Sequence, residues 1–214
     1  MRISTAVHAA AIAALCLAAP AAAQKTPEKI KLTERSRDGA VLIRVPVRPY
    51  SYALQFSKNG SSGFMSRVYL MKVQEGAPSF GYVARTLSPG RYRLDWIWQQ
   101  GHWSACLEKG TIQFDVKPGR IEYVGTIRAD RVLASIQERA FSTGQIEKVG
   151  TAYDVSHAGV EVPPVEDRDE AGLGAARAFA DSAMNGSGRL VELAGVETTA
   201  FGTSGFGKAV KTCG

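Results

Sequence analysis

Short runs of alternating apolar and polar residues, separated by tight-turn residues, most constrain the fold of this chain. Two Pro-Gly pairs, Pro89-Gly90 and Pro118-Gly119, each lead into such a run. Proline presets the φ angle that begins a tight turn, and glycine accepts the positive φ that ends it. Alternation at period two is typical of strands that bury one face. About six or seven such runs at roughly ten-residue spacing predict an antiparallel β-sandwich or barrel.

We expect this sandwich to occupy residues 39–152 of the chain. Residues 132–141 fit a helical and a strand period, and continuity with the preceding sheet favours a strand there. Residues 153–166 are interpreted as a linker to the C-terminal part of the chain. The fold class is therefore mainly β up to this point.

A C-terminal helix is predicted to follow the linker. Asp167 with Glu170 three residues later resembles a capping box, and Asn185-Gly186 ends the periodic segment. One apolar stripe is formed by Leu173, Ala176, Phe179, Ala180 and Ala183. Residues 190–201 return to strand character, so we expect residues 167–214 to form a helix and a return strand packed on the sandwich.

The first 23 residues have the pattern of a secretory signal peptide. Arg2 supplies a short positive region, an apolar stretch too short to span a bilayer follows, and small residues up to Ala23 suit signal peptidase. Leu15 before Cys16 argues against processing as a lipoprotein. We expect a periplasmic or secreted protein without a membrane span after cleavage, beginning with a polar arm over residues 24–38.

Removal of the signal peptide would leave two cysteines, Cys106 and Cys213. An oxidising compartment favours a disulfide between them, which the chain-entropy model values at roughly 4–5 kcal/mol for so long a loop. The alternative is two unrelated thiols, one buried and one on a frayed tail.

Composition and motifs exclude several functional classes. The chain has 26 basic and 20 acidic residues, a surplus too mild for a dedicated nucleic-acid-binding protein. His102 and His157 have no Cys, Asp or Glu at a recognised ligand spacing, so we predict neither a metal centre nor a cofactor. Asp95, His102 and Ser104 can be imagined as a hydrolytic set, but their spacing does not require it. We name no catalytic residue and favour a non-enzymatic function.

The candidate ligand-binding surface is the aromatic run at residues 91–98 and the loop after it. Tyr92, Leu94, Trp96 and Trp98 are expected on one face, opposite Arg91, Arg93, Asp95 and Ile97. Such an aromatic strip, with His102 and Trp103, can stack sugar rings or a peptide. The alternative, which we favour, is that these aromatic residues form half of the sandwich core.

A recurring pattern runs through residues 87–127: Pro-Gly-x-Tyr-x-Leu at residues 89–94, then Cys106, then Phe-x-Val-x-Pro-Gly-x-Ile-x-Tyr-x-Gly at residues 114–125. In this pattern the chain resembles a broad group of bacterial envelope proteins of unknown function, many of them lipoproteins. The resemblance implies a small β-sandwich of the kind found in transthyretin-like and carboxypeptidase-regulatory-like modules, and it supplies no catalytic residues. For the fold class we expect a transthyretin-like or immunoglobulin-like sandwich. The leading hypothesis is a non-enzymatic module that binds or scaffolds an envelope protein or glycan. The alternatives are a glycan or small-ligand binder that uses the aromatic strip, and an envelope-acting hydrolase.

Overall fold

The computed structural model describes residues 30–46, 52–59, 67–70, 80–99, 103–143, 147–149, 152–201 and 212. Residues 1–23, the predicted signal peptide, lie outside the described residues, as do 24–29 of the predicted arm. The part of the arm that is described is docked: Ile30 is fully buried, and the Gly119 amide donates to the Asp38 carbonyl at 2.9 Å.

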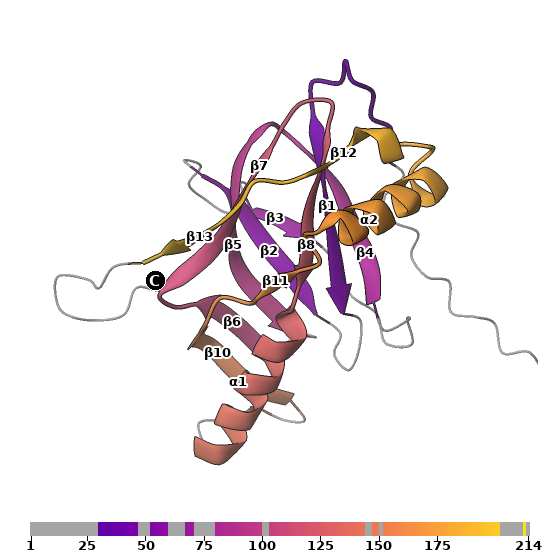
Figure 1. The fold of residues 1–214 in the computed structure, drawn as a ribbon. Coiled ribbons are helices and arrows are strands. Elements are labelled where there is room, and N and C mark those ends of the chain that lie inside the picture. Colours follow the sequence, from indigo (N-terminus) through magenta and orange to yellow (C-terminus); the bar gives the residue numbers. More distant parts are fainter. Residues whose placement is uncertain are drawn as a thin grey trace, which may run out of the picture.

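The described strands form two sheets (Figure 1). The five-stranded sheet contains β1 (Gly39–Pro46), β4 (Phe80–Leu87), β8 (Ile121–Ile127), β11 (Val165–Glu166) and β12 (Val191–Leu193). The eight-stranded sheet contains β2 (Ala53–Lys58), β3 (Arg67–Leu70), β5 (Gly90–Gln99), β6 (Trp103–Leu107), β7 (Gly110–Val116), β9 (Glu147–Val149), β10 (Ala152–Val160) and β13 (Val196–Ala200). The helical elements are α1 (Ala129–Thr143), α2 (Glu170–Ala183) and the short 3₁₀ helix η2 (Gly188–Leu190).

The expectation of a mainly β fold is confirmed, but the strand pairing is mixed. β1 pairs antiparallel with β4 and parallel with β8, and β12 and β10 also join their sheets in parallel pairs. The structure therefore lacks the purely antiparallel arrangement that we expected from the sequence. Parallel neighbours need long crossover connections, and the chain between β1 and β8 supplies one by passing through the eight-stranded sheet.

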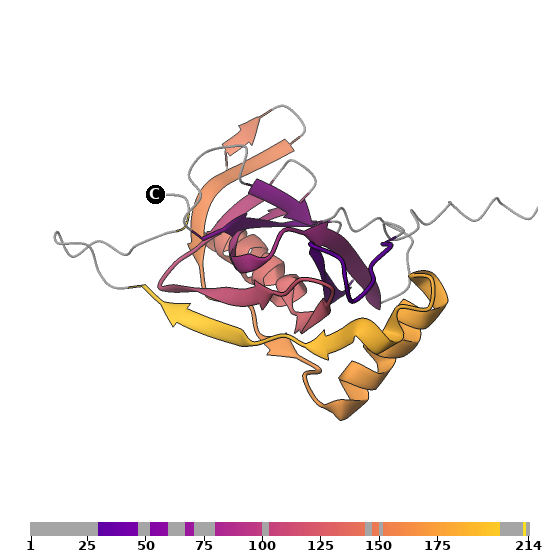
Figure 2. The same ribbon diagram turned by 90° about the horizontal axis from the view of Figure 1, so that it is seen from above.

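The main core lies between the two sheets and includes one side of α1. Its largest fully buried side chains include Tyr52, Phe56 and Phe114, and the Phe56 and Phe114 rings meet edge to face at 5.3 Å. A second core lies on the opposite face of the five-stranded sheet, which α2 covers with Ala176 and Ala180 (Figure 2). The apolar stripe predicted for the C-terminal helix is confirmed, because all five of its residues belong to or pack on this second core.

Two interpretations of the middle of the chain were wrong. Residues 132–141 are helical, within α1, and not a strand. Val132 and Ile136 are one helical turn apart, so with Leu133 they reach the main core together, while Glu138 stays exposed. Residues 153–166 are not a linker either, because β10 and β11 occupy most of this segment.

The cap of α2 is two residues later than the sequence indicated. Asp169 is the N-cap, and its carboxylate accepts a hydrogen bond from the Gly172 amide at 2.8 Å. Asp167 has a left-handed φ of 55° and instead accepts hydrogen bonds from Arg44 and Thr126. The tertiary partners of Asp167 therefore decide which of the two aspartates caps the helix.

We expect Asp169→Ala to lower the free energy of unfolding by about 1 kcal/mol, because the Gly172 amide loses its acceptor. Chemical denaturation measures this change. Glu170→Ala, an exposed change in the same helical turn, is the matched control. An Asp169→Ala variant that unfolds at the wild-type denaturant concentration would contradict the capping assignment.

Candidate functional site

The described residues of the predicted aromatic strip are buried. Tyr92 is 2% exposed, and its hydroxyl donates to the Ser88 carbonyl at 2.9 Å. Trp96 is 8% exposed. The side chains of Trp98 and Trp103, and all of His102, lie outside the described residues. Of the predicted ligand-binding residues, those that the structure describes therefore face the interior of the protein.

The two faces expected for residues 91–98 are not maintained along β5. Opposite β2, Gln55 pairs with Trp96 while Phe56 pairs with Leu94, so Asp95 is an extra residue in a β-bulge. The alternation of side chains between the two faces of β5 shifts by one residue at this bulge. Ile97, which we expected on the charged face, is fully buried in the main core with Tyr92 and Leu94.

Asp95 also takes a different partner from the one considered for a hydrolytic set. Its carboxylate accepts a hydrogen bond from Nε of Arg93 at 2.9 Å. The Arg93 side chain is half exposed, whereas the Asp95 side chain is buried. His102 and the Ser104 side chain lie outside the described residues. The structure therefore describes only Asp95 of these three side chains.

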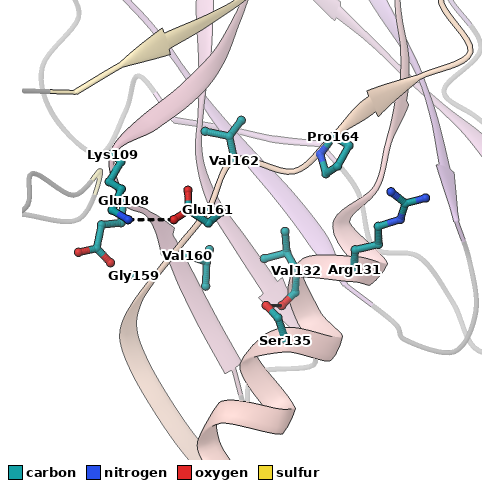
Figure 3. Close-up of a pocket in the computed structure, with 10 residues that line it drawn as sticks. All are labelled: Glu108, Lys109, Arg131, Val132, Ser135, Gly159, Val160, Glu161, Val162 and Pro164. Atoms are coloured by element: carbon teal, nitrogen blue, oxygen red, sulfur yellow. Dashed lines mark hydrogen bonds and ion pairs between the residues drawn. The ribbon is translucent and has the colours of Figure 1, made fainter.

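An open cavity of about 530 Å³ lies between α1, β10 and the β6–β7 connection (Figure 3). Its lining combines aliphatic side chains with charged groups of both signs. The lining residues are Glu108, Lys109, Arg131, Val132, Ser135, Gly159, Val160, Glu161, Val162 and Pro164. None of them belongs to the predicted aromatic strip.

One wall of the cavity is formed where the chain leaves β6. The Glu108 amide donates to the Val160 carbonyl at 2.7 Å, which ties this wall to the end of β10. Lys109 has a left-handed φ of 67°, and its ammonium lies 3.1 Å from the Glu161 carboxylate. Both ends of this ion pair are largely exposed, so it adds little stability and can be replaced by contacts to a ligand.

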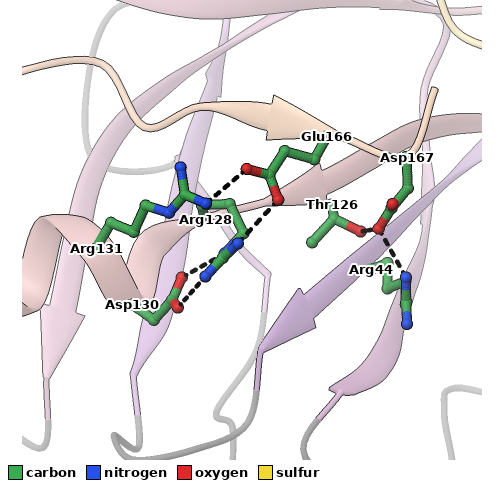
Figure 4. Close-up of polar contacts among 7 residues, drawn as sticks. All are labelled: Arg44, Thr126, Arg128, Asp130, Arg131, Glu166 and Asp167. Atoms are coloured by element: carbon green, nitrogen blue, oxygen red, sulfur yellow. Dashed lines mark hydrogen bonds and ion pairs between the residues drawn. The ribbon is translucent and has the colours of Figure 1, made fainter.

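The opposite wall carries Arg131, which a chain of ion pairs holds in place (Figure 4). Arg128 contacts Asp130 and Glu166, each at 2.8 Å, and Glu166 also accepts from Arg131 at 2.9 Å. Hydrogen bonds to Asp130 and then to Glu166 raise the pKa of the Arg128 guanidinium above its ordinary value. The network fixes the start of α1 to β11 and places a guanidinium, still 54% exposed, at the cavity rim.

A second polar group in Figure 4 has a structural role. Asp167 accepts from the Arg44 guanidinium and the Thr126 hydroxyl, both at 2.6 Å. These partners belong to β1 and β8, so the contacts attach the segment before α2 to two neighbouring strands.

Glu122, on β8, is a fully buried carboxylate and therefore a candidate acid. Burial raises its pKa above the ordinary value, which the Lys117 ammonium, 3.5 Å away, opposes. Glu192 on the paired strand β12 raises the pKa further. Glu122 is not among the residues that line the cavity described above, so it has no part in that site.

Sequence reasoning did not find the cavity residues. Lys109, Arg131 and Glu161 are separated along the chain, and each taken alone has the pattern of an ordinary surface charge. They meet only because β10 pairs in parallel with β6 and α1 follows β8 directly. A helical interpretation of residues 132–141 would have placed Arg131 and Ser135 one turn apart on a single face.

Comparison with known proteins gives no match to a family model, to a curated protein or to a solved structure. Within the part of the chain that the structure describes, no group of His, Cys, Asp and Glu side chains has the arrangement of a metal site. No described helix is long and apolar enough to cross a membrane.

The buried carboxylate of Glu122 predicts a specific pH dependence of stability. Its pKa is higher in the folded protein than the value of 4.5 expected after unfolding, so this group favours folding at low pH. That contribution is lost as the pH rises above 4.5 and through the raised pKa. We therefore expect Glu122→Gln to reduce the fall in unfolding free energy over this range, measured by denaturation at a series of pH values.

Glu138→Gln, which changes an exposed carboxylate of α1, is the control for that experiment. It should leave the pH profile of the wild type unchanged. If the unfolding free energies of the wild type and of Glu122→Gln change in parallel with pH, burial does not raise the pKa of Glu122.

Proposed function

We propose that this protein is a non-enzymatic binding module of the bacterial cell envelope, and that its ligand occupies the cavity between α1 and β10. The observation that carries the proposal is the combination of an aliphatic floor and a charged rim in one open cavity. Val132 and Val160 are core residues that also line it, so the floor is rigid, whereas Lys109, Arg131 and Glu161 are largely exposed at the rim.

The chemistry of the lining favours a peptide segment of a partner protein over a glycan. Sugar rings usually stack on aromatic side chains, whereas the described lining is aliphatic. A peptide can offer an aliphatic side chain to Val132, Val160 and Val162 and charges of both signs to the rim. Since basic and acidic rim residues occur together, a peptide with one acidic and one basic residue beside the aliphatic one is the best electrostatic match.

A binding role fits the way in which the titratable groups near the cavity are used. Arg128, Asp130 and Glu166 pair with one another and hold elements together. Catalysis needs an acid, base or nucleophile directed at a substrate, and these paired groups instead position the rim of the cavity.

Export remains part of the proposal. The signal-peptide pattern of residues 1–23 supports a periplasmic or secreted protein, and the motif at residues 87–127 supports kinship with the envelope proteins it resembles. A sandwich of the transthyretin-like or immunoglobulin-like kind is the corresponding proposal for the fold. Two packed sheets support it, and the parallel pairs β1–β8 and β6–β10 are departures that such a fold would have to accommodate.

A peptide array tests the proposed ligand class. The full chain is applied to short peptides in which a Leu or Val is flanked by Asp, Lys, both or neither, and in parallel to an oligosaccharide array. We expect binding to peptides that carry both charges. Ser135→Trp fills the cavity from α1 and should reduce this binding at least about tenfold, because one blocked aliphatic contact costs roughly 1.5–3 kcal/mol.

Glu138→Trp is the matched control, because residue 138 is exposed on the same helix and does not line the cavity. It should bind as the wild type does. Binding to oligosaccharides alone, or peptide binding that survives Ser135→Trp, would overturn the assignment of this cavity. Cleavage of the bound peptides, seen as product masses, would overturn the non-enzymatic part of the proposal.

The mass of the exported protein tests its location. When the chain is produced with residues 1–23 in a Gram-negative host, we expect periplasmic protein whose N-terminal residue is Gln24. Full-length protein confined to the cytoplasm would contradict export. That result would not affect the proposed ligand site, which the peptide array tests separately.

A further inference from the structure

Lys109, in the wall of the cavity, has a strained backbone. Its φ of 67° lies in the left-handed region, which is unfavourable for a residue with a Cβ. Among the described residues other than glycine, Asp167 and Asn185 also have a positive φ, but aspartate and asparagine are the types that tolerate it. A lysine in this conformation is unusual. Strain of this kind is typically retained where it places a functional side chain.

The strain arises at a break between β6 and β7. Both strands pair with β5, β6 up to Cys106 and β7 from Gln113 onward. Between these two pairings, Glu108 and Lys109 leave the ladder and form one wall of the cavity. Irregularities in a ladder redirect side chains in this way, often beside functional sites. Cys213, with which we expected Cys106 to form a disulfide, lies outside the described residues, so that expectation stays a prediction.

The backbone on both sides of the break is held by neighbouring strands. The Glu108 amide donates to the carbonyl of Val160, the last residue of β10, at 2.7 Å. The Phe201 amide, directly after β13, donates to the Lys109 carbonyl at 2.6 Å, and β13 pairs with the start of β7. Since β10 and β13 fix the conformation from two directions, the strain at Lys109 persists in the folded protein.

The Lys109 ammonium is the rim cation that can most readily change partners. It reaches the Glu161 carboxylate at 3.1 Å, and the two side chains are 69% and 76% exposed (Figure 3). So exposed an ion pair contributes little to stability and is exchanged at small cost. Arg131 instead shares Glu166 with Arg128, in the network that attaches α1 to β11. A peptide can therefore bind the Lys109 ammonium without disturbing the fold.

We propose that Lys109 is the specificity-determining residue of this cavity and selects an acidic side chain on the bound peptide. On binding, the ammonium turns from the Glu161 carboxylate to the carboxylate of the peptide. Glu161 then becomes available to the basic group of the same peptide, so one ion pair is replaced by two. This inference rests on the proposed function, because it assigns a role within the same cavity.

Two matched peptides test this selection. Both carry a Leu and a Lys, and they differ only in an Asp or an Asn beside the Leu. We expect the full-length wild type to bind the Asp peptide about two- to fivefold more tightly, the range of an exposed ion pair. Lys109→Gly should bind both peptides equally, because the ammonium is gone. Lys109→Arg keeps the charge and should keep the preference.

Lys31→Gly is the matched control, because it removes an exposed lysine that does not line the cavity, and it should keep the preference. An unchanged preference in Lys109→Gly, or no preference in the wild type, would overturn the role of Lys109 and leave the cavity as the ligand site. Loss of both peptides in Lys109→Gly would show that residue 109 shapes the wall and does not select a charge. A wild type that binds neither peptide would overturn the proposed function itself.

Denaturation tests the strain separately from binding. Lys109→Gly and Lys109→Ala both remove the ammonium, but only glycine suits a φ of 67°. We expect Lys109→Gly to unfold at a higher denaturant concentration than Lys109→Ala. An equal or lower midpoint would show that the break does not strain residue 109, which would overturn the argument that the strain is retained to place the ammonium.

Discussion

The structure depends on β8, a strand that is buried on both faces. Its inward residues meet the main core, and its outward residues Ile121 and Tyr123 lie under α2. Burial raises the pKa of the Tyr123 hydroxyl to about 12, so it stays uncharged there. β1, β11 and β12 all pair with this one strand. Because three distant parts of the chain use β8 as their template, the position of both helices follows from it.

Glycine at residue 125 makes this arrangement possible. Gly125 has a φ of 110° at an irregularity in the β1–β8 register, and a Cβ there would lie 2.6 Å from the Glu166 carbonyl. The close approach lets β11 pair with the end of β8 and lets Arg168 reach the carbonyls of Val124 and Ala194. The same approach brings Glu166 to Arg128 and Arg131, so the rim of the cavity depends on a residue without a side chain.

Local patterns predicted the parts of the fold that depend on local chemistry. The Pro-Gly turns, the strand runs and the apolar stripe of α2 were found because each is encoded within a few residues. The errors occurred where distant residues decide. Asp169 rather than Asp167 caps α2, because Asp167 is hydrogen-bonded to Arg44 and Thr126. Ile97 lies in the core because the β-bulge at Asp95 shifts the alternation of inward and outward side chains. The cavity went unpredicted for the same reason, since its walls come from parallel pairing that no local period encodes.

The C-terminal strands β12 and β13 belong to different sheets, β12 beside β8 and β13 beside β7. Neither sheet is complete until the last part of the chain is available. Both sheets therefore depend on residues 191–200 for one of their strands. Long-range pairing of this kind slows folding and extends the time during which a chaperone can hold the chain unfolded.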